Sequence, residues 1–471
     1  MPTLKRRDFI AVAAMPFVQA APAADAPNVL FVICDQMRAD ALGLLGNPNA
    51  RTPHLDKLAS EGVLFERCTS ANPVCVPSRK SMFTGLYPHH HGSLTNEHDS
   101  FLPLRDTMLG YFQKQGYRTG YFGKNHTFTK EAMAQLEATG IRDREKFRAY
   151  DPDVTPWWHA SAPWPEEKCH PHLNTEDALR FIGSVKPGER FFATVSYFDP
   201  HPPYFAPPRH LAKISADKMV IPKTPLADAL SPRLAEHSRG MGFERMTDQV
   251  IRETMRHYHA AVDWGVDEQV GRLMAGLRRA GHDRNTIVVM VSDHGDFMGN
   301  YHMVRKGMFL QEALLHVPMI WWAPGRFSRG VRSTAPVQLT DIYPTLVELT
   351  GGKALESTDG VSAKAALAGG EPRRKTMYAS AGYGELDAAK LKAGEGQDAL
   401  HKRVFDQEMQ ETHRTAMIRE GEWKLILSET RGPELYHLPG RSHETVNVAE
   451  SPQHAAVRRD LEKKMGKWWT W

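Results

Sequence analysis

The sequence contains little cysteine, no long block of one charge sign and no internal repeat. Four cysteines among 471 residues are too few for a disulfide scaffold. Cys68 and Cys169 could pair, although nothing in the sequence decides whether they do. The 59 basic and 55 acidic residues are interspersed and leave a formal net charge of +4. We therefore expect no nucleic-acid partner, because proteins that bind nucleic acids gather their basic residues into a patch.

Apolar runs are also short. After residue 25, no stretch approaches the roughly 18 uninterrupted apolar residues of a membrane-spanning helix, so we expect no membrane span in the mature protein. Residues 1–25 are different, because Lys5, Arg6 and Arg7 precede the apolar run 11–21 and then small residues, which is typical of an export signal. The arginine pair resembles a twin-arginine signal, with an ordinary secretory signal as the alternative. We expect export to the periplasm or the medium by the twin-arginine export machinery.

Short apolar runs rich in β-branched residues predict strands that are buried on both faces. These runs are residues 28–33, 119–122, 191–196, 286–291 and 317–322, and helix-like segments lie between them at 52–61, 107–115, 175–182 and 256–280. Because strands alternate with helices, we predict that residues 26–370 form an α/β domain. Its core would be a large mixed, mainly parallel sheet flanked by helices.

The remaining residues, 371–471, predict a smaller C-terminal antiparallel sheet with a packed helix. The expected strands are 414–419, 423–427 and 434–438, and the expected helix is 453–468. A polar stretch at 369–412 would separate this part from the main body. Two segments rich in proline, 151–171 and 200–208, predict ordered loops over one edge of the main sheet.

Polar side chains follow several predicted strands at the point where each strand ends. In an open parallel sheet, groups just past the carboxyl ends of the strands converge, so we expect one site at this edge. The residues are Asp35, Gln36, Lys124, His126, His201, Asp293 and His294. Taken singly, each would more often be a helix cap or a surface residue.

Two carboxylates and an amide oxygen suit a hard metal ion. Asp35, Gln36, Asp293 and His294 therefore form a plausible metal set, in which the imidazole fits less comfortably than the oxygen ligands. We expect Ca2+, with Mg2+ or Mn2+ as alternatives.

The segment 73–79 places Cys75 beside the start of a short helix. Pro77 suits the first turn of this helix, and Gly85 would end it. Unpaired backbone amides at a helix N-terminus favour negative charge. The residues alone therefore allow either a reactive thiolate or a buried structural cysteine.

The run Cys75-Val76-Pro77-Ser78-Arg79 resembles the signature of type I sulfatases, a family of the alkaline phosphatase superfamily. Further matching segments follow in family order along nearly the whole mature chain: Asp35-Gln36, 52–56, 123–126, 199–204, 292–296, Lys306 and 434–438. In that family the cysteine is oxidised to formylglycine, whose hydrate is the nucleophile. The resemblance implies that a formylglycine-generating or sulfatase-maturating enzyme converts Cys75.

The resemblance also implies roles for the site residues. Formylglycine at position 75 would join the metal ligands, and Arg79 would orient it. Lys124 and Lys306 would hold the sulfate oxygens. His201 would contact sulfate and protonate the leaving alcohol, and His126 would be the base that allows the second hydroxyl of the hydrate to expel sulfate.

Gln36 departs from the commonest family pattern, in which a second Asp stands at this position. Gln also occurs there in relatives that cleave phosphonate monoesters and phosphodiesters. The leading hypothesis is hydrolysis of a sulfate ester on a small molecule or oligosaccharide, with a carbohydrate preferred. A phosphonate monoester or phosphodiester hydrolase with the same nucleophile is the alternative, and an inactive glycan-binding relative is a third reading.

Overall fold

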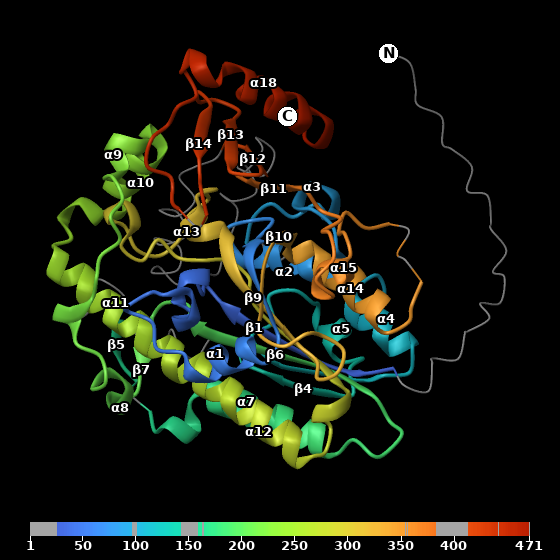
Figure 1. The fold of residues 1–471 in the computed structure, drawn as a ribbon. Helices are drawn as coiled ribbons and strands as arrows, with labels where there is room; N and C mark the ends of the chain where they lie inside the picture. The colour runs from blue at the N-terminus through green and yellow to red at the C-terminus, as the bar shows by residue number, and fades with distance from the viewer. Residues whose placement is uncertain are drawn as a thin grey trace, which may run out of the picture.

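The computed structural model describes residues 26–96, 101–142, 159–162, 164–353, 355, 357–382, 413–440 and 442–470. An eight-stranded sheet lies at its centre (Figure 1). In spatial order the strands are β10 (Val331–Gln338), β2 (Val63–Thr69), β9 (His316–Trp322), β8 (Thr286–Ser292), β1 (Asn28–Asp35), β6 (Phe191–Pro200), β3 (Arg118–Gly123) and β4 (Ala138–Ile141). All neighbours pair in parallel except β9, which is antiparallel to β2 and β8.

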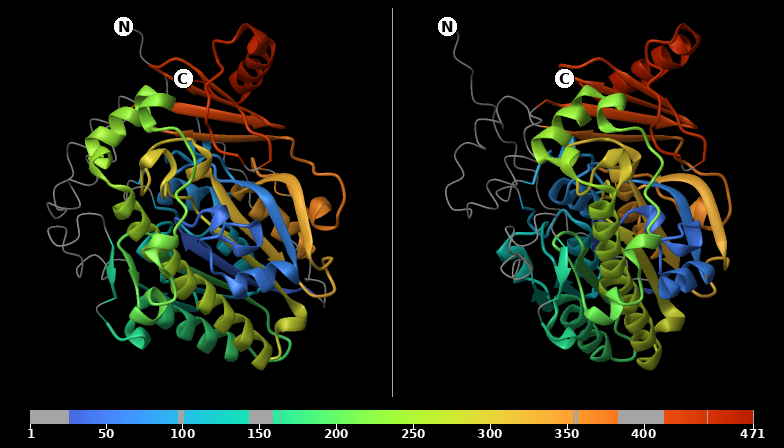
Figure 2. Two further views of the ribbon diagram at one scale, coloured as in Figure 1. Left: turned by 60° about the vertical axis from the view of Figure 1, so that its left-hand side comes forward. Right: turned by 90° about the vertical axis from the view of Figure 1, so that its left-hand side faces the viewer.

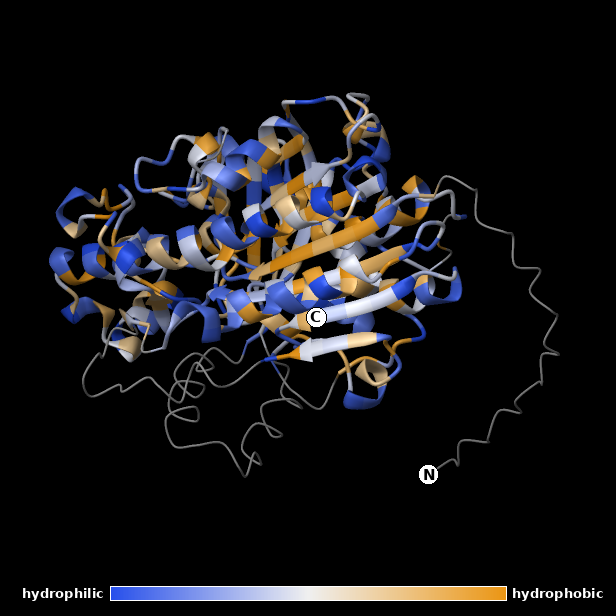
Figure 3. Ribbon diagram, turned by 90° about the horizontal axis from the view of Figure 1, so that it is seen from below, coloured by the Kyte–Doolittle hydropathy of each residue, from blue (hydrophilic) through white to orange (hydrophobic). Residues whose placement is uncertain are grey.

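The central strand β1 is buried on both faces, as its continuous apolar run predicts. Leu30 and Val32 point to one hydrophobic cluster, whereas Phe31 and Ile33 point to the cluster on the opposite face. This alternation follows from the two-residue repeat of a strand. In Figure 3 the strands at the centre are largely hydrophobic, whereas the helices around them carry both hydrophilic and hydrophobic residues.

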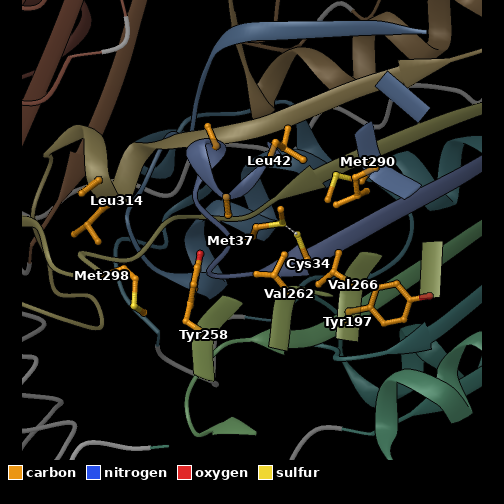
Figure 4. Packing of buried hydrophobic residues seen from close by; sticks show 14 of the residues in the cluster. Cys34, Met37, Leu42, Tyr197, Tyr258, Val262, Val266, Met290, Met298 and Leu314 are labelled. Atoms are coloured by element: carbon orange, nitrogen blue, oxygen red, sulfur yellow. Dashed lines mark hydrogen bonds between the residues drawn. The ribbon is translucent and has the colours of Figure 1, made fainter. Parts of the chain in front are cut away.

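Helices cover both faces of the sheet. One face carries α1 (Pro53–Ser60), α7 (His170–Gly183), α11 (Asp248–Val262) and α12 (Gln269–Arg279), and the other carries α2 (Cys75–Thr84), α4 (Met108–Lys114), α14 (Ile342–Leu349) and α15 (Lys364–Leu367). Further helices lie in the connections: α3 (Pro88–His91), α5 (Lys130–Met133), α8 (Pro208–Leu211), α9 (Ala227–Leu230), α10 (Pro232–Met241) and α13 (Glu312–Leu315). Figure 4 shows Cys34 and Met37, at and beyond the end of β1, packed near Tyr258 and Val262 of α11.

The C-terminal part forms a second sheet with the strand order β11 (Thr376–Ala381), β12 (Thr415–Glu420), β13 (Trp423–Ser428) and β14 (Glu434–His437). All its pairings are antiparallel. Alternate residues of β12 serve two partners: Ile418 packs in the cluster of helix α18 (Ala455–Trp468), whereas Met417 belongs to the core of the main body. The sheet therefore lies between the main body and α18 (Figure 2).

A buried ion network joins the two sheets. Glu312 of α13 contacts Arg419 of β12 and Lys424 of β13, and Lys424 also lies 2.7 Å from Glu444. All four side chains are at most 4% exposed. Because each charge has an opposite partner, the network can be accommodated inside the protein.

The predicted α/β architecture, its mainly parallel sheet and the C-terminal antiparallel sheet with its helix are confirmed. Several elements differ from the prediction. The stretch 369–412 was predicted as a separating segment, but it contains β11, which pairs with β12. The predicted loops contain the short strands β5 (His159–Ser161) and β7 (Tyr204–Ala206), which pair in parallel. The predicted helix 256–280 begins earlier, at Asp248, and includes a π-helical turn at Asp263–Glu268.

All four cysteines are free and buried, so Cys68 and Cys169 do not form a disulfide. Within the described ranges, none of the helices combines the length and the apolar character needed to cross a membrane. The predicted export signal, residues 1–25, lies outside the described residues, as do residues 151–158 and 163 of the proline-rich segment.

Candidate active site

The site lies where parallel strands end side by side. Cys34 of β1 pairs in register with Ser292 of β8, so the residues that follow, Asp35 and Asp293, are neighbours. On the other side of β1, β6 and β3 end at the same edge of the sheet, where Lys124 follows β3. The strand ends therefore bring together Asp35, Asp293 and Lys124, three of the groups that the sequence pattern predicts to converge.

Cys75 is the first residue of α2, whereas the sequence pattern placed it just ahead of the helix. Val74, in an extended conformation, precedes the helix, and Gly85 ends it with a left-handed φ of 71°. The Cys75 side chain is only 1% exposed. Its Sγ lies 3.1 Å from Lys306 Nζ, 3.3 Å from His294 Nε2, 3.5 Å from Lys124 Nζ and 3.6 Å from Asp35 Oδ1.

Arg79, one turn further along α2, connects the two carboxylates. Its Nε donates to Asp293 Oδ2 at 2.7 Å, and its Nη2 donates to Asp35 Oδ2 at 3.2 Å. A third bond runs from Nη1 to Ser196 Oγ at 2.7 Å. The guanidinium is fully buried and presents its donors in a rigid plane, so it fixes the orientation of both carboxylates and ties them to the helix that carries Cys75.

The predicted metal residues fit a cation. Ligand atoms of Asp35, Cys75, Asp293 and His294 all lie within 4.8 Å of one another, and all four residues are buried. The Nδ1 of His294 lies 2.9 Å from the carbonyl oxygen of Gly295, which makes Nδ1 the donor and leaves Nε2 as an acceptor toward the site. The Oε1 of Gln36 is a buried acceptor with no hydrogen-bond partner. Such an atom suits a metal ligand.

Electrostatics at the site favour negative charge. Burial raises the pKa of Asp35, but Lys124, His201 and Arg79 lower it by more, so that this pKa lies well below its usual range. Burial and Asp35 raise the pKa of the Cys75 thiol. The two lysines and His294 lower it by more, so the pKa of the thiol lies below its ordinary value. A side chain at position 75 is thus surrounded by groups that stabilise an anion.

The other two predicted histidines, His201 and His126, are not among the groups that contact the Cys75 thiol. His201 is partly buried, with Nδ1 2.6 Å from the carbonyl oxygen of Pro202 and its ring 4.7 Å from that of Phe198. Lys124 lies over the same Phe198 ring at 4.7 Å, which places His201 beside the lysine. His126 is partly buried and follows Lys124 by two residues, without being among the four groups that contact the Cys75 thiol.

Sequence reasoning missed the residues that support these side chains. Asp296 accepts hydrogen bonds from Gln36 and Tyr204, and Ser196 accepts one from Arg79. Asp296 and Tyr204 both lie in segments that carry the family resemblance, but their partners come from distant positions. Nothing in the sequence pattern pairs them.

Comparison with known proteins shows the family of the chain. The family model described as Sulfatase matches residues 27–352, more than half of the chain. The chain belongs to the sulfatase family. It is therefore a sulfuric ester hydrolase of the alkaline phosphatase superfamily, as the signature around Cys75 implied.

Individual relatives of this sulfatase extend the comparison. An arylsulfatase of Clostridium perfringens is 29% identical over 72% of this chain and 78% of its own length. An ulvan-active sulfatase of Formosa agariphila is 32% identical over 71% of this chain and 63% of its own length. Among solved structures, a phosphonate monoester hydrolase from Silicibacter pomeroyi has a TM-score of 0.76 and 26% identity, with 94% of each chain covered.

Proposed function

We propose that this sulfatase hydrolyses a sulfate ester on a carbohydrate to an alcohol and inorganic sulfate, using a formylglycine derived from Cys75 and a divalent metal. The observation that carries the proposal is the convergence of the Cys75 side chain with two carboxylates and two lysines in a buried site. Asp35, Gln36, Asp293 and His294 would hold the metal. We expect Ca2+, with Mg2+ or Mn2+ as alternatives, because most of the donors are oxygen atoms.

The metal ion, the formylglycine and the residues of the chain would have different roles in the reaction. A bound divalent cation supplies positive charge that offsets the charge developing on the departing ester oxygen. Formylglycine at position 75 would supply, as its hydrate, the hydroxyl that displaces the alcohol from sulfur and a second hydroxyl that must lose its proton for the aldehyde to re-form and sulfate to leave. Lys124 and Lys306 are positioned to bind sulfate oxygens, because both ammonium groups lie within 3.5 Å of the side chain at position 75.

Arg79 would orient the nucleophile through the two carboxylates that it already holds. His201, beside Lys124, would contact sulfate and protonate the leaving alcohol. His126 would remove the proton from the second hydroxyl of the hydrate. These two assignments follow the family resemblance and the position of both residues beyond the strand ends.

Two measurements test the reaction. Mass spectrometry of the peptide that contains Cys75 should reveal the mass loss of thiol-to-aldehyde conversion. Cys75→Ala should abolish turnover of an aryl sulfate, whereas Cys169→Ala, at a buried cysteine 5% exposed and outside the site, should leave it unchanged. An active protein with an unmodified Cys75 would contradict the proposal.

The second candidate is a phosphonate monoester or phosphodiester hydrolase. Gln36 and the whole-length likeness to the Silicibacter pomeroyi enzyme favour it. We prefer a carbohydrate sulfate ester as the substrate because the family model is that of sulfatases and one relative is named for activity on ulvan, a polysaccharide. Parallel assays with an aryl sulfate and an aryl phosphonate separate the two, and a large catalytic preference for phosphorus would reverse the order.

Maturation and export belong to the same proposal. We expect a formylglycine-generating or sulfatase-maturating enzyme to act on Cys75, and residues 1–25 to direct the protein through the twin-arginine machinery to the periplasm or the medium. We also retain residues 26–370 as the catalytic domain and 371–471 as the C-terminal subdomain. N-terminal sequencing of the exported protein should find a start close to residue 26.

A further inference from the structure

Gln36 is held in an unusual way at the end of β1. Its backbone has a left-handed φ of 70°, and its backbone N–H donates to Asp293 Oδ1 at 3.1 Å. Its side-chain Nε2 donates to Asp296 Oδ2 at 2.6 Å, while Oε1 is buried without a hydrogen-bond partner. The two ends of this amide therefore face different surroundings.

Asp296 determines which end faces which way. This side chain is fully buried, and its Oδ2 accepts a second hydrogen bond from the Tyr204 hydroxyl at 2.7 Å. Its Oδ1 accepts one from the backbone N–H of Met298 at 2.8 Å. All three partners donate, so the carboxylate serves purely as an acceptor. The opposite orientation of the Gln36 amide would bring two acceptor oxygens into contact.

We propose that Asp296 is a positioning residue that, with Tyr204, fixes the Gln36 amide so that Oε1 faces the metal. The inference rests on the metal site of the proposed function and deepens it. It also accounts for glutamine at this position: a carboxylate at position 36 would meet the carboxylate of Asp296 at hydrogen-bonding distance. A neutral amide supplies an oxygen ligand and a donor in one side chain.

A double-mutant cycle tests the positioning role through metal binding rather than activity. The dissociation constants of Ca2+ and Mn2+ are measured by calorimetry on the chelator-treated mature protein. Asp296→Asn should raise Kd roughly 10–100-fold, the usual effect of removing a group that orients a ligand. In a Gln36→Leu background the same change should raise Kd by less than about threefold, because no amide remains to be oriented.

The cycle separates two effects of Asp296→Asn on Kd: the loss of amide orientation and the loss of a negative charge. The charge is lost equally in both backgrounds, so only the loss of orientation makes the two effects differ. Asp267→Asn is the matched control: Asp267 is a carboxylate 1% exposed that accepts from the backbone N–H groups of His54 and Leu55, away from the site. It should leave Kd unchanged. If Asp296→Asn does not fold, Tyr204→Phe replaces it in the cycle, with a smaller rise in Kd expected in the same pattern.

An unchanged Kd in Asp296→Asn, or an equal effect in both backgrounds, would overturn the inference. A wild-type protein that binds neither cation would overturn both the inference and the proposed metal. Turnover of an aryl sulfate by the wild-type protein is recorded in parallel. If the cations bind with the expected pattern but no sulfate ester is hydrolysed, the proposed function fails while the positioning role of Asp296 stands.

Discussion

Replacing Glu312 with Gln should destabilise the protein more than any change to a surface ion pair. The substitution keeps the size of the side chain but removes the charge that faces Arg419 and Lys424, both buried. Breaking a buried pair by removing one partner costs about 3–5 kcal/mol, because the partner charge remains in the interior. Unfolding entropy of about 2.1 cal/mol/K per residue gives ~1 kcal/mol/K for this chain length, so Tm should fall by about 3–5 °C.

The effect should also depend on pH. Burial raises the pKa of Glu312, but Arg419 and Lys424 lower it by more, so that the pKa in the folded protein lies well below the ordinary value of 4.5. A group whose folded pKa is depressed contributes stability above its unfolded pKa and loses it as pH falls toward the folded pKa. With an unfolded pKa of about 4.5, about 0.8 kcal/mol of the difference between wild type and variant should be gone at pH 4.

Scanning calorimetry at pH 7 and pH 4 provides the measurement. Glu236→Gln is the control, because Glu236 pairs with Arg431 at 2.7 Å with both side chains more than 40% exposed. Its Tm should stay within about a degree of wild type, as expected for a surface pair. A Tm of Glu312→Gln no lower than that of the control, or a gap that widens at pH 4, would refute the reasoning.

Three further predictions concern the site and its support. Arg79→Lys keeps the charge but cannot hold Asp35 and Asp293 in one plane, so kcat/KM for an aryl sulfate should fall at least about 100-fold while circular dichroism stays unchanged. Lys306→Ala should lower kcat/KM about 100–1,000-fold. The loss should be greater for an aryl sulfate than for an aryl phosphonate, because the phosphonate has one terminal oxygen fewer. Equal losses for the two substrates would refute a hydrogen-bonding role of Lys306. Trp468 stacks on Tyr378 with ring centroids 4.6 Å apart, so Trp468→Ala should cost about 2 kcal/mol and speed amide exchange in α18; unchanged exchange would contradict this.

Within the main sheet, the strands that the sequence predicted are those buried on both faces, where apolar residues run with little interruption. β2 escaped prediction because Glu66 and Arg67 interrupt its apolar run in a half-buried stretch. β10 escaped because it is an edge strand with alternating exposure, and Pro336 lies at an irregularity of its pairing. Such a position tolerates proline, which a central strand does not. In the main sheet, burial on both faces therefore separates the strands that the sequence predicts from those that it misses.

A similar limit applies to the site. Asp35, Asp293 and Lys124 could be predicted from their positions directly after strands, because parallel strands end at a common edge. Cys75 and Lys306 lie on a helix and a loop, so the family resemblance was needed to assign them. The contact between Gln36 and Asp296 required the fold itself, since it joins residues 260 positions apart in sequence. The strand pattern predicts the backbone position of a residue at the edge of the sheet. It does not predict which residue its side chain contacts.

The burial of Cys75 constrains when its conversion can occur. Asn72, in the loop before Cys75, donates to the backbone oxygen of Ser380 at 2.7 Å, and the N–H of Ser380 donates to the backbone oxygen of Ala71. The C-terminal sheet thus contacts the loop that precedes Cys75, and Cys75 itself is 1% exposed. If Cys75 is converted to formylglycine, as proposed, the modifying enzyme must act before Lys306, His294, Lys124 and Asp35 pack around the side chain. If the twin-arginine machinery exports the folded chain, conversion must also precede export and take place inside the cell.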